Sequence, residues 1–204
     1  MIEALLLFAA APAMTAIEVE RAYAADAQKL GQWTAFRKYA ADDAIMFLPQ
    51  ADSAQKFLKD RPDPPVAVFW WPGRSYLSCD GKTAINTGPW VRQWGKSVGY
   101  FTTVWQRQPD GRWKWLLDHG DALRVPRSEG GDIKPEQAAC PNVTLPPGPE
   151  REVPKGVKHG GGSSKDGTLR WNWSVLPDGS RTFWASIWDG RQYRIVIEDR
   201  VAAE

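Results

Sequence analysis

Residues 99–119 read GYFTTVWQRQPDGRWKWLLDH, and this stretch decides the class of fold. Aromatic and β-branched residues fill both of its halves, which is the composition of β-strands. Between the halves stands Pro109-Asp110-Gly111, in which proline presets one backbone dihedral angle and glycine allows a positive φ. The stretch therefore predicts a long antiparallel hairpin with strands at 98–108 and 112–119.

The second strand of this hairpin carries a period-two pattern that predicts which side chains share a face. Successive side chains of a strand point to opposite faces. One set consists of Trp113, Trp115, Leu117 and His119, and the other of Lys114, Leu116 and Asp118. Because a lysine favours water, we expect the first set to face the interior, with His119 near the end of an aromatic wall.

The sequence before the hairpin begins with helical periodicity. Apolar residues recur at steps of three and four over 17–30, which predicts a helix that ends at Gly31. A second helix is predicted over 34–41 with Thr34 as its N-cap, followed by a short strand at 44–48. Ser53 is placed to cap a third helix over 54–59.

Strand periodicity then takes over. Strands are predicted at 66–71, 74–79 and 83–87, because turn-forming pairs separate these runs. The pairs are Pro72-Gly73, Asp80-Gly81 and Gly88-Pro89. Helices that come first and antiparallel strands that follow indicate an α+β fold, in which N-terminal helices pack on one face of a curved antiparallel sheet.

The last third of the chain has a different composition. Proline and glycine are frequent over 121–166, which predicts a linker. Three further runs, at 168–176, 181–188 and 191–198, predict a three-stranded antiparallel meander within 167–204. Its first strand turns Leu169, Trp171, Trp173 and Val175 to one face. So small a sheet is marginal alone, and we expect the first domain or a second copy of the chain, in a homodimer, to cover that face.

The N-terminus has features of an export signal. An apolar run over 4–13 ends in Ala11-Pro12-Ala13, which predicts a signal peptide over 1–13 and a periplasmic or secreted protein. The run is shorter than the roughly 20 residues that a membrane-spanning helix needs, so we expect no stable span in the mature protein. The run is preceded by Glu3 and no basic residue, which is atypical of a signal, and a buried N-terminal helix is the alternative.

Export would place Cys79 and Cys140 in an oxidising compartment, where a disulfide between them is plausible. Such a disulfide would stabilise the fold by ~4 kcal/mol in the chain-entropy model. Two buried free thiols are the alternative.

Composition excludes several classes of function. The formal net charge is only +2 and the basic residues are scattered, so we expect no nucleic-acid partner. The sequence contains no phosphate-binding loop, dinucleotide fingerprint or nucleophile elbow, so no cofactor is indicated. The Cys and His residues include no closely spaced pair, so no metal site is predicted. The twelve tryptophans can serve either as core or as ligand platforms.

Residues 17–120 resemble the nuclear transport factor 2-like superfamily, specifically its SnoaL-like branch, which includes a bacterial subset of unknown function. The resemblance rests on the helix pair that leads into Asp42-Asp43-Ala-Ile-Met-Phe47 and on the hairpin at 99–119. It implies a cone, or cystatin-like fold, in which three helices close one side of a strongly bent sheet around an apolar pocket. Proteins of this fold include isomerases, dehydratases, cyclases, transport factors and proteins without catalysis.

The resemblance also indicates which side chains form a site. We expect five aromatic side chains to line the pocket and bind a ligand: Trp33, Phe36, Phe47, Trp105 and Trp115. His119 is the candidate general base, since its unperturbed pKa of about 6.5 suits proton transfer near neutrality. Asp43 or Tyr23 is its candidate partner, and Asp26 is a further one. In the alternative interpretation His119 only ends a hairpin and bonds a carbonyl.

Three functions remain open at this point. The first is an exported protein that binds a small hydrophobic molecule in the pocket without chemistry of its own. The second is a lyase or isomerase that uses the His119 and Asp43 pair. The third is a structural dimer whose cone is filled by its own tryptophans.

Overall fold

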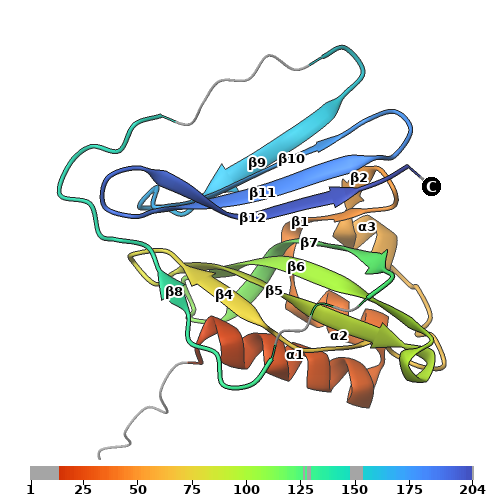
Figure 1. Cartoon of the computed structure of the whole chain (residues 1–204). Helices are drawn as coiled ribbons and strands as arrows, with labels where there is room; N and C mark the ends of the chain where they lie inside the picture. The colour runs from red at the N-terminus through yellow and green to blue at the C-terminus, as the bar shows by residue number, and fades with distance from the viewer. Residues whose placement is uncertain (1–13, 126, 128–129, 148–153, 204) are drawn as a thin grey trace, which may run out of the picture.

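The computed structural model describes residues 14–125, 127, 130–147 and 154–203. Figure 1 shows three layers, with helices on one face of a large sheet and a second, smaller sheet on the other face. The predicted signal peptide, residues 1–13, lies outside the described residues. No helix in the described part of the chain is long and apolar enough to cross a membrane.

The helices form where their caps and apolar stripes predict them. Helix α1 (Ala16–Leu30) begins with a capping box, in which Thr15 Oγ1 accepts from Glu18 N at 3.2 Å and Thr15 N donates to Glu18 Oε2 at 2.7 Å. It ends at Gly31, whose φ of +107° few other residues adopt. Helix α3 (Ala54–Leu58) has Ser53 as its N-cap, as predicted.

Helix α2 (Gln32–Tyr39) begins two residues before its predicted start. Its N-cap is Gly31 and not Thr34, whose backbone N and hydroxyl donate to the two carboxylate oxygens of Asp63 at 2.9 and 2.6 Å. A carboxylate from a distant loop therefore satisfies the N-terminal amide that a local cap would otherwise bind.

The large sheet has the strand order β2-β1-β7-β6-β5-β4-β8, and β3 pairs with β5. Its strands are β1 (Ala40–Phe47), β2 (Ala51–Ser53), β3 (Phe69–Trp70), β4 (Arg74–Leu77), β5 (Thr83–Arg92), β6 (Ser97–Arg107), β7 (Trp113–Leu123) and β8 (Glu136–Gln137). The predicted hairpin is confirmed as β6 and β7, which pair antiparallel. Only the pairs β1–β7 and β4–β8 are parallel among these strands.

The turn predicted at Gly88-Pro89 is wrong, since β5 continues through both residues to Arg92. Gly88 is needed there for close approach, because a Cβ atom at this position would lie 2.2 Å from the carbonyl oxygen of Trp71. The chain turns instead at Gln93–Gly95, where Trp94 has a φ of +60°.

A β-bulge at Leu116 overturns the predicted alternation along β7. Trp105 pairs with Trp115 while the preceding Val104 pairs with Leu117, so Leu116 has no partner of its own on β6. The extra residue exchanges the two faces of the strand. Trp115 therefore faces the helices, whereas Leu117 packs against the second sheet.

The second sheet is antiparallel in the order β12-β11-β10-β9. It consists of β9 (Lys158–Ser163), β10 (Leu169–Val175), β11 (Arg181–Trp188) and β12 (Tyr193–Val201). The three predicted strands are joined by a fourth, β9, which lies inside the segment predicted to be a linker. Glycines make this strand possible, because a Cβ atom at Gly160 or Gly162 would lie 2.5 Å from the ring of Trp173 or Trp171. The rings of β10 thus cover an edge strand that has few side chains of its own.

The two sheets are held together by an apolar layer and by a short crossing segment. Ile85, Val104 and Leu117 of the large sheet pack with Leu169 and Phe183 of the small one, so the large sheet covers the apolar face of β10. The disulfide between Cys79 and Cys140 is present, as predicted. Next to it, the segment that contains β8 bonds both sheets, from Ala138 N to Leu77 O at 2.8 Å and from Ala139 N to Trp188 O at 2.9 Å.

Candidate functional site

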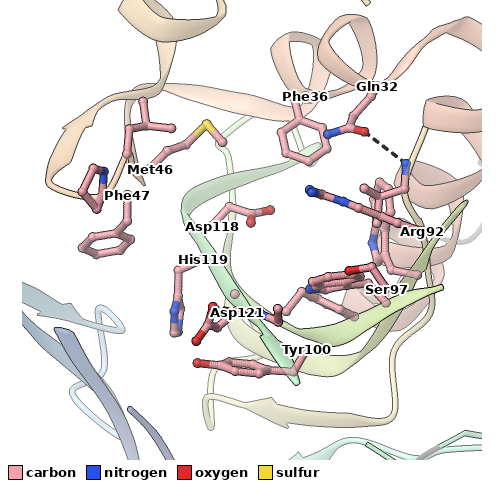
Figure 2. A pocket seen from close by; sticks show the side chains of 18 of the residues that line it. Gln32, Phe36, Met46, Phe47, Arg92, Ser97, Tyr100, Asp118, His119 and Asp121 are labelled. Carbon is pink, nitrogen blue, oxygen red and sulfur yellow. Dashed lines mark hydrogen bonds between the residues drawn. The ribbon is translucent and has the colours of Figure 1, made fainter. Parts of the chain in front are cut away.

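A cavity of about 610 Å³ lies on the helix side of the large sheet, where β5 and β7 end and β6 begins. Its walls include several aromatic side chains, among them Trp33 and Phe36 of α2 and Trp90 of β5. The polar side chains that reach it include Gln32, Arg92, Ser97 and Asp118. Figure 2 shows Asp118 and Arg92 pointing into this space from opposite sides. An apolar cavity with few polar groups is the usual form of a small-molecule site.

The core beside the cavity is packed with the protein's own side chains. Trp105 and Trp115, which were expected to line the pocket, are fully buried in the core and lie outside the lining. Glu20 is buried beside them and accepts from Trp70 Nε1 at 2.9 Å, from Trp105 Nε1 at 2.6 Å and from Asn86 Nδ2 at 3.2 Å. Burial raises the pKa of Glu20 to about 7, although these three donors act to lower it.

Asp118 is the acidic group that faces the helix side of the sheet. Among the described residues its one hydrogen-bond partner is Thr103, whose hydroxyl donates to Oδ2 at a long 3.4 Å. Burial, and secondarily the nearby Glu20, raises the pKa of Asp118 well above its usual range. Burial therefore favours the protonated form of Asp118 more than in an exposed carboxyl, and in that form its hydroxyl can donate a hydrogen bond to a ligand oxygen.

Tyr23 lies close to this acid but inside the core. It is fully buried, and its hydroxyl has no hydrogen-bond partner among the described residues. Burial, and next the charge of Asp118, raises the pKa of Tyr23 well above 10. The structure therefore brings Tyr23 near Asp118, and not near His119 as expected.

His119 points away from the helix side, because of the bulge at Leu116. It belongs to the cavity lining near the C-terminal end of β7. Figure 2 shows its imidazole directed toward the second sheet. Its Nε2 lies 3.2 Å from Asp199 Oδ2, and its ring centroid lies 4.8 Å from that of Phe183. Burial lowers the pKa of His119, against the opposing influence of Asp199.

Asp199, not Asp43, is the acidic neighbour of His119. It is almost fully buried, and it accepts from Thr102 Oγ1 at 2.7 Å and from Arg127 Nη2 at 2.6 Å. Burial acts to raise the pKa of Asp199, but His119 and Arg127 outweigh it and lower that pKa. This network joins the two sheets.

The other predicted site residues divide between cavity, surface and core. Trp33, Phe36 and Phe47 line the cavity as expected, although Phe47 also packs against Trp173 of the second sheet. Asp43 is exposed on β1 and lies outside the lining. Asp26 bonds Lys38 and Tyr39 on the helix surface. Within the described part of the chain, no three His, Cys, Asp or Glu side chains gather closely enough to hold a metal ion.

Sequence reasoning missed Asp118 and Asp199 for different reasons. Asp118 was placed on the wrong face because strict alternation was assumed through the bulge. The adjacent leucines at 116 and 117 were an available signal, since both are apolar and only a bulge or a sheet covered on both faces buries both. Asp199 lies in the last strand, about eighty residues from His119, and nothing local links the two.

No protein-family model matches the chain, and no curated protein matches it either. Several solved structures resemble about half of it. A candidate ketosteroid isomerase from Parabacteroides distasonis is 18% identical, over 54% of this chain and 89% of its own, with a TM-score of 0.42. A second candidate ketosteroid isomerase, from Shewanella frigidimarina, is 19% identical over 52% of this chain and 95% of its own, with a TM-score of 0.38.

A nuclear transport factor 2-like superfamily protein from Salmonella enterica is 13% identical over 56% of this chain and 95% of its own, with a TM-score of 0.39. At these identities and scores the likeness concerns the fold and carries no function to this chain. The Salmonella enterica protein bears the superfamily name that the sequence resemblance indicated, while the SnoaL-like branch and the conical outline stay predictions.

Proposed function

We propose that the chain binds a small, largely apolar molecule with an oxygen acceptor, such as a ketone, in the cavity beside Asp118. The observation that carries this proposal is the inward carboxyl of Asp118, which has one long hydrogen bond within aromatic walls. A buried polar group with unused hydrogen-bonding capacity is costly, and a ligand oxygen would satisfy it. The aromatic walls supply the apolar contact.

The test compares two probes of the same shape, acetonaphthone and ethylnaphthalene, by calorimetric titration. One neutral hydrogen bond is worth about 1 kcal/mol, so the ketone should bind about fivefold more tightly than the hydrocarbon. Asp118→Leu should abolish this preference, whereas Asp118→Asn, which keeps a donor, should retain most of it. Asp43→Asn, at the exposed carboxylate of β1, is the matched control and should change nothing. Equal affinities for both probes in the wild type would refute the role of Asp118.

A second candidate function is proton transfer at such a ketone, in the manner of a lyase or isomerase. It is favoured by the raised pKa of Asp118, because a carboxyl that titrates nearer to neutrality can both take and return a proton. The ionised form of Asp118 would take a proton from the carbon next to the carbonyl and return it to the product. Here Asp118 replaces His119 in the acid–base role.

The two candidates are separated by following deuterium incorporation into the methyl group of acetonaphthone by NMR in heavy water. A binding protein leaves the exchange at its background rate. An enzyme accelerates the exchange, and Asp118→Asn then stops it while leaving the affinity nearly unchanged. Acceleration that survives in Asp118→Asn would exclude Asp118 as the base.

We also propose that the protein acts in an oxidising compartment outside the cytoplasm. The support is the disulfide between Cys79 and Cys140, a bond that persists chiefly in such compartments. Export by the segment 1–13 and pairing with a second copy of the chain stay predictions. Mass spectrometry of the secreted chain tests the first, since an intact Met1 in the exported protein would contradict cleavage after Ala13.

A further inference from the structure

The cavity also holds a cation that the proposed ketone contact does not use. Arg92 is the last residue of β5, and its side chain lies in the cavity lining opposite Asp118. Figure 2 shows its guanidinium directed into the cavity from the side opposite Asp118. Its position at the mouth leaves the residue exposed, so its charged end can meet both a ligand and water.

The neighbouring residues of the sheet hold this side chain in place. Trp90 and Arg92 lie two residues apart on β5 and therefore share a face. The guanidinium carbon lies 5.0 Å from the centre of the Trp90 ring, which is within the range of a cation–π contact. The ring itself lies against Gly99, where a Cβ atom would come within 2.3 Å of it. The glycine therefore makes room for the ring, and the ring supports the guanidinium.

Within the part of the chain that the structure describes, the guanidinium of Arg92 has no acidic partner. It makes no ion pair or hydrogen bond there, in contrast to Arg127, whose guanidinium bonds Asp199 at 2.6 Å. Partial burial lowers the pKa of Arg92, and no nearby charge acts in the opposite direction. An arginine held over a ring at the mouth of an apolar cavity, with five donors unused, is suited to a planar anion.

The lining also contains other titratable groups. Burial raises the pKa of Asp118, which favours its neutral form over its charged form. Asp121 lies three residues after Asp118 on β7, so the alternation of the strand places it on the opposite face. Its Oδ1 accepts from Ala122 N at 2.8 Å. Arg181 adds a second positive charge to the lining and donates to Gly120 O at 2.6 Å. Among the described residues, neither Asp118 nor Asp121 forms an ion pair with Arg92.

We propose that the natural ligand is an organic acid, whose carboxylate binds the guanidinium of Arg92 while its apolar body lies against the aromatic walls. This inference rests on the proposed function and names the class of its ligand. Arginine and carboxylate form two parallel, charge-assisted hydrogen bonds, which a neutral amide of the same shape cannot replace. Such bonds are worth more than neutral ones, so the carboxylate should bind about 10- to 100-fold more tightly than its amide.

The test is a calorimetric titration of the full chain near neutral pH with naphthoate and with naphthamide. The wild type should prefer naphthoate by the factor given above. Arg92→Gln should lower the affinity for naphthoate to that for naphthamide and leave naphthamide within about twofold of wild type. Lys96→Gln is the matched control, because it removes the same charge from the same hairpin at a residue outside the lining. It should leave both affinities unchanged.

The other outcomes each count against a defined claim. Equal binding of the two probes by the wild type, a comparison that needs no variant, would overturn the inference and leave the proposed binding function standing. A loss of naphthoate affinity in Lys96→Gln as large as that in Arg92→Gln would overturn it as well, since it would show a long-range charge effect. If neither probe binds, the inference and the proposed function fall together.

Discussion

Glu20 should make the stability of this protein fall as the pH rises, and Glu20→Gln should remove that dependence. The carboxyl is fully buried between α1 and the sheet and accepts hydrogen bonds from Trp70, Trp105 and Asn86. Burial disfavours its charged form and raises its pKa from 4.5 to about 7. The folded state therefore holds this proton more tightly than the unfolded state does.

The size of the effect follows from the two pKa values. Each pH unit between them changes the free energy of unfolding by about 1.4 kcal/mol, which gives roughly 3 kcal/mol in all for Glu20. This stability is fully present below pH 4.5 and is lost as the pH rises through about 7. Glutamine cannot titrate, so the variant lacks this contribution to the pH dependence. It also presents an amide N–H to one of the donors, which costs about 1 to 3 kcal/mol at every pH.

The assay is urea unfolding at a series of pH values from about 5 to about 8, followed by tryptophan fluorescence. Other groups titrate in the same range, so the quantity of interest is the difference between the wild type and Glu20→Gln at each pH. Over this range the wild type should lose roughly 2.5 kcal/mol relative to the variant, which brings the variant level with the wild type or above it. Glu198→Gln, at an exposed carboxylate of β12, is the control and should run parallel to the wild type. If Glu20→Gln runs parallel as well, Glu20 does not titrate in this range and the argument from its burial is wrong.

Three other perturbations have clear expected results in urea unfolding. Asp199→Ala leaves Arg127 without its buried partner and should destabilise the fold by about 3 kcal/mol, while an unchanged midpoint would show that the sheets do not depend on this network. Replacing Cys79 and Cys140 together by serine opens a loop of 61 residues and should cost about 4 kcal/mol, and a reducing agent should produce the same loss in the wild type alone. Thr15→Ala removes the capping box of α1 and should cost about 1 kcal/mol, which an unaltered free energy of unfolding would contradict.

Local features of this fold could be read from the sequence, because their causes lie within a few residues. The helix α1 follows from its apolar stripe and from Gly31, and the turn of the β6–β7 hairpin follows from Pro109-Asp110-Gly111. Pairing between distant segments could not be read in this way. Asp63 binds the first turn of α2 from a loop some thirty residues away, and β9 exists only because the rings of Trp171 and Trp173 cover its glycines.

The sequence pattern predicted the candidate site on the correct strand, β7, but on the wrong face of that strand. A bulge shifts the parity of every residue after it, so the single extra Leu116 moved Asp118 to the helix side and His119 to the second sheet. Of the five aromatic residues expected in the walls, the structure places Phe36 in the cavity lining, on a helix whose periodicity no bulge interrupts, whereas Trp105 and Trp115 lie in the core. A strand is thus a weaker basis than a helix for assigning a catalytic side chain.

The second sheet explains why a face of the large sheet that carries polar residues could be mistaken for a face exposed to solvent. Asn86 and Thr87 are neighbours on β5 and point to opposite faces, yet both are completely buried. Asn86 donates to Ala16 O at 2.9 Å on the helix side, whereas Thr87 accepts from Arg127 at 2.6 Å on the other side. A strand covered on both faces satisfies its polar side chains with partners from two layers, so polarity alone no longer marks exposure. It follows that β7 places its two adjacent titratable residues in separate environments. Asp118 lies beside the cavity on the helix side, and His119 lies in the polar network that joins the two sheets.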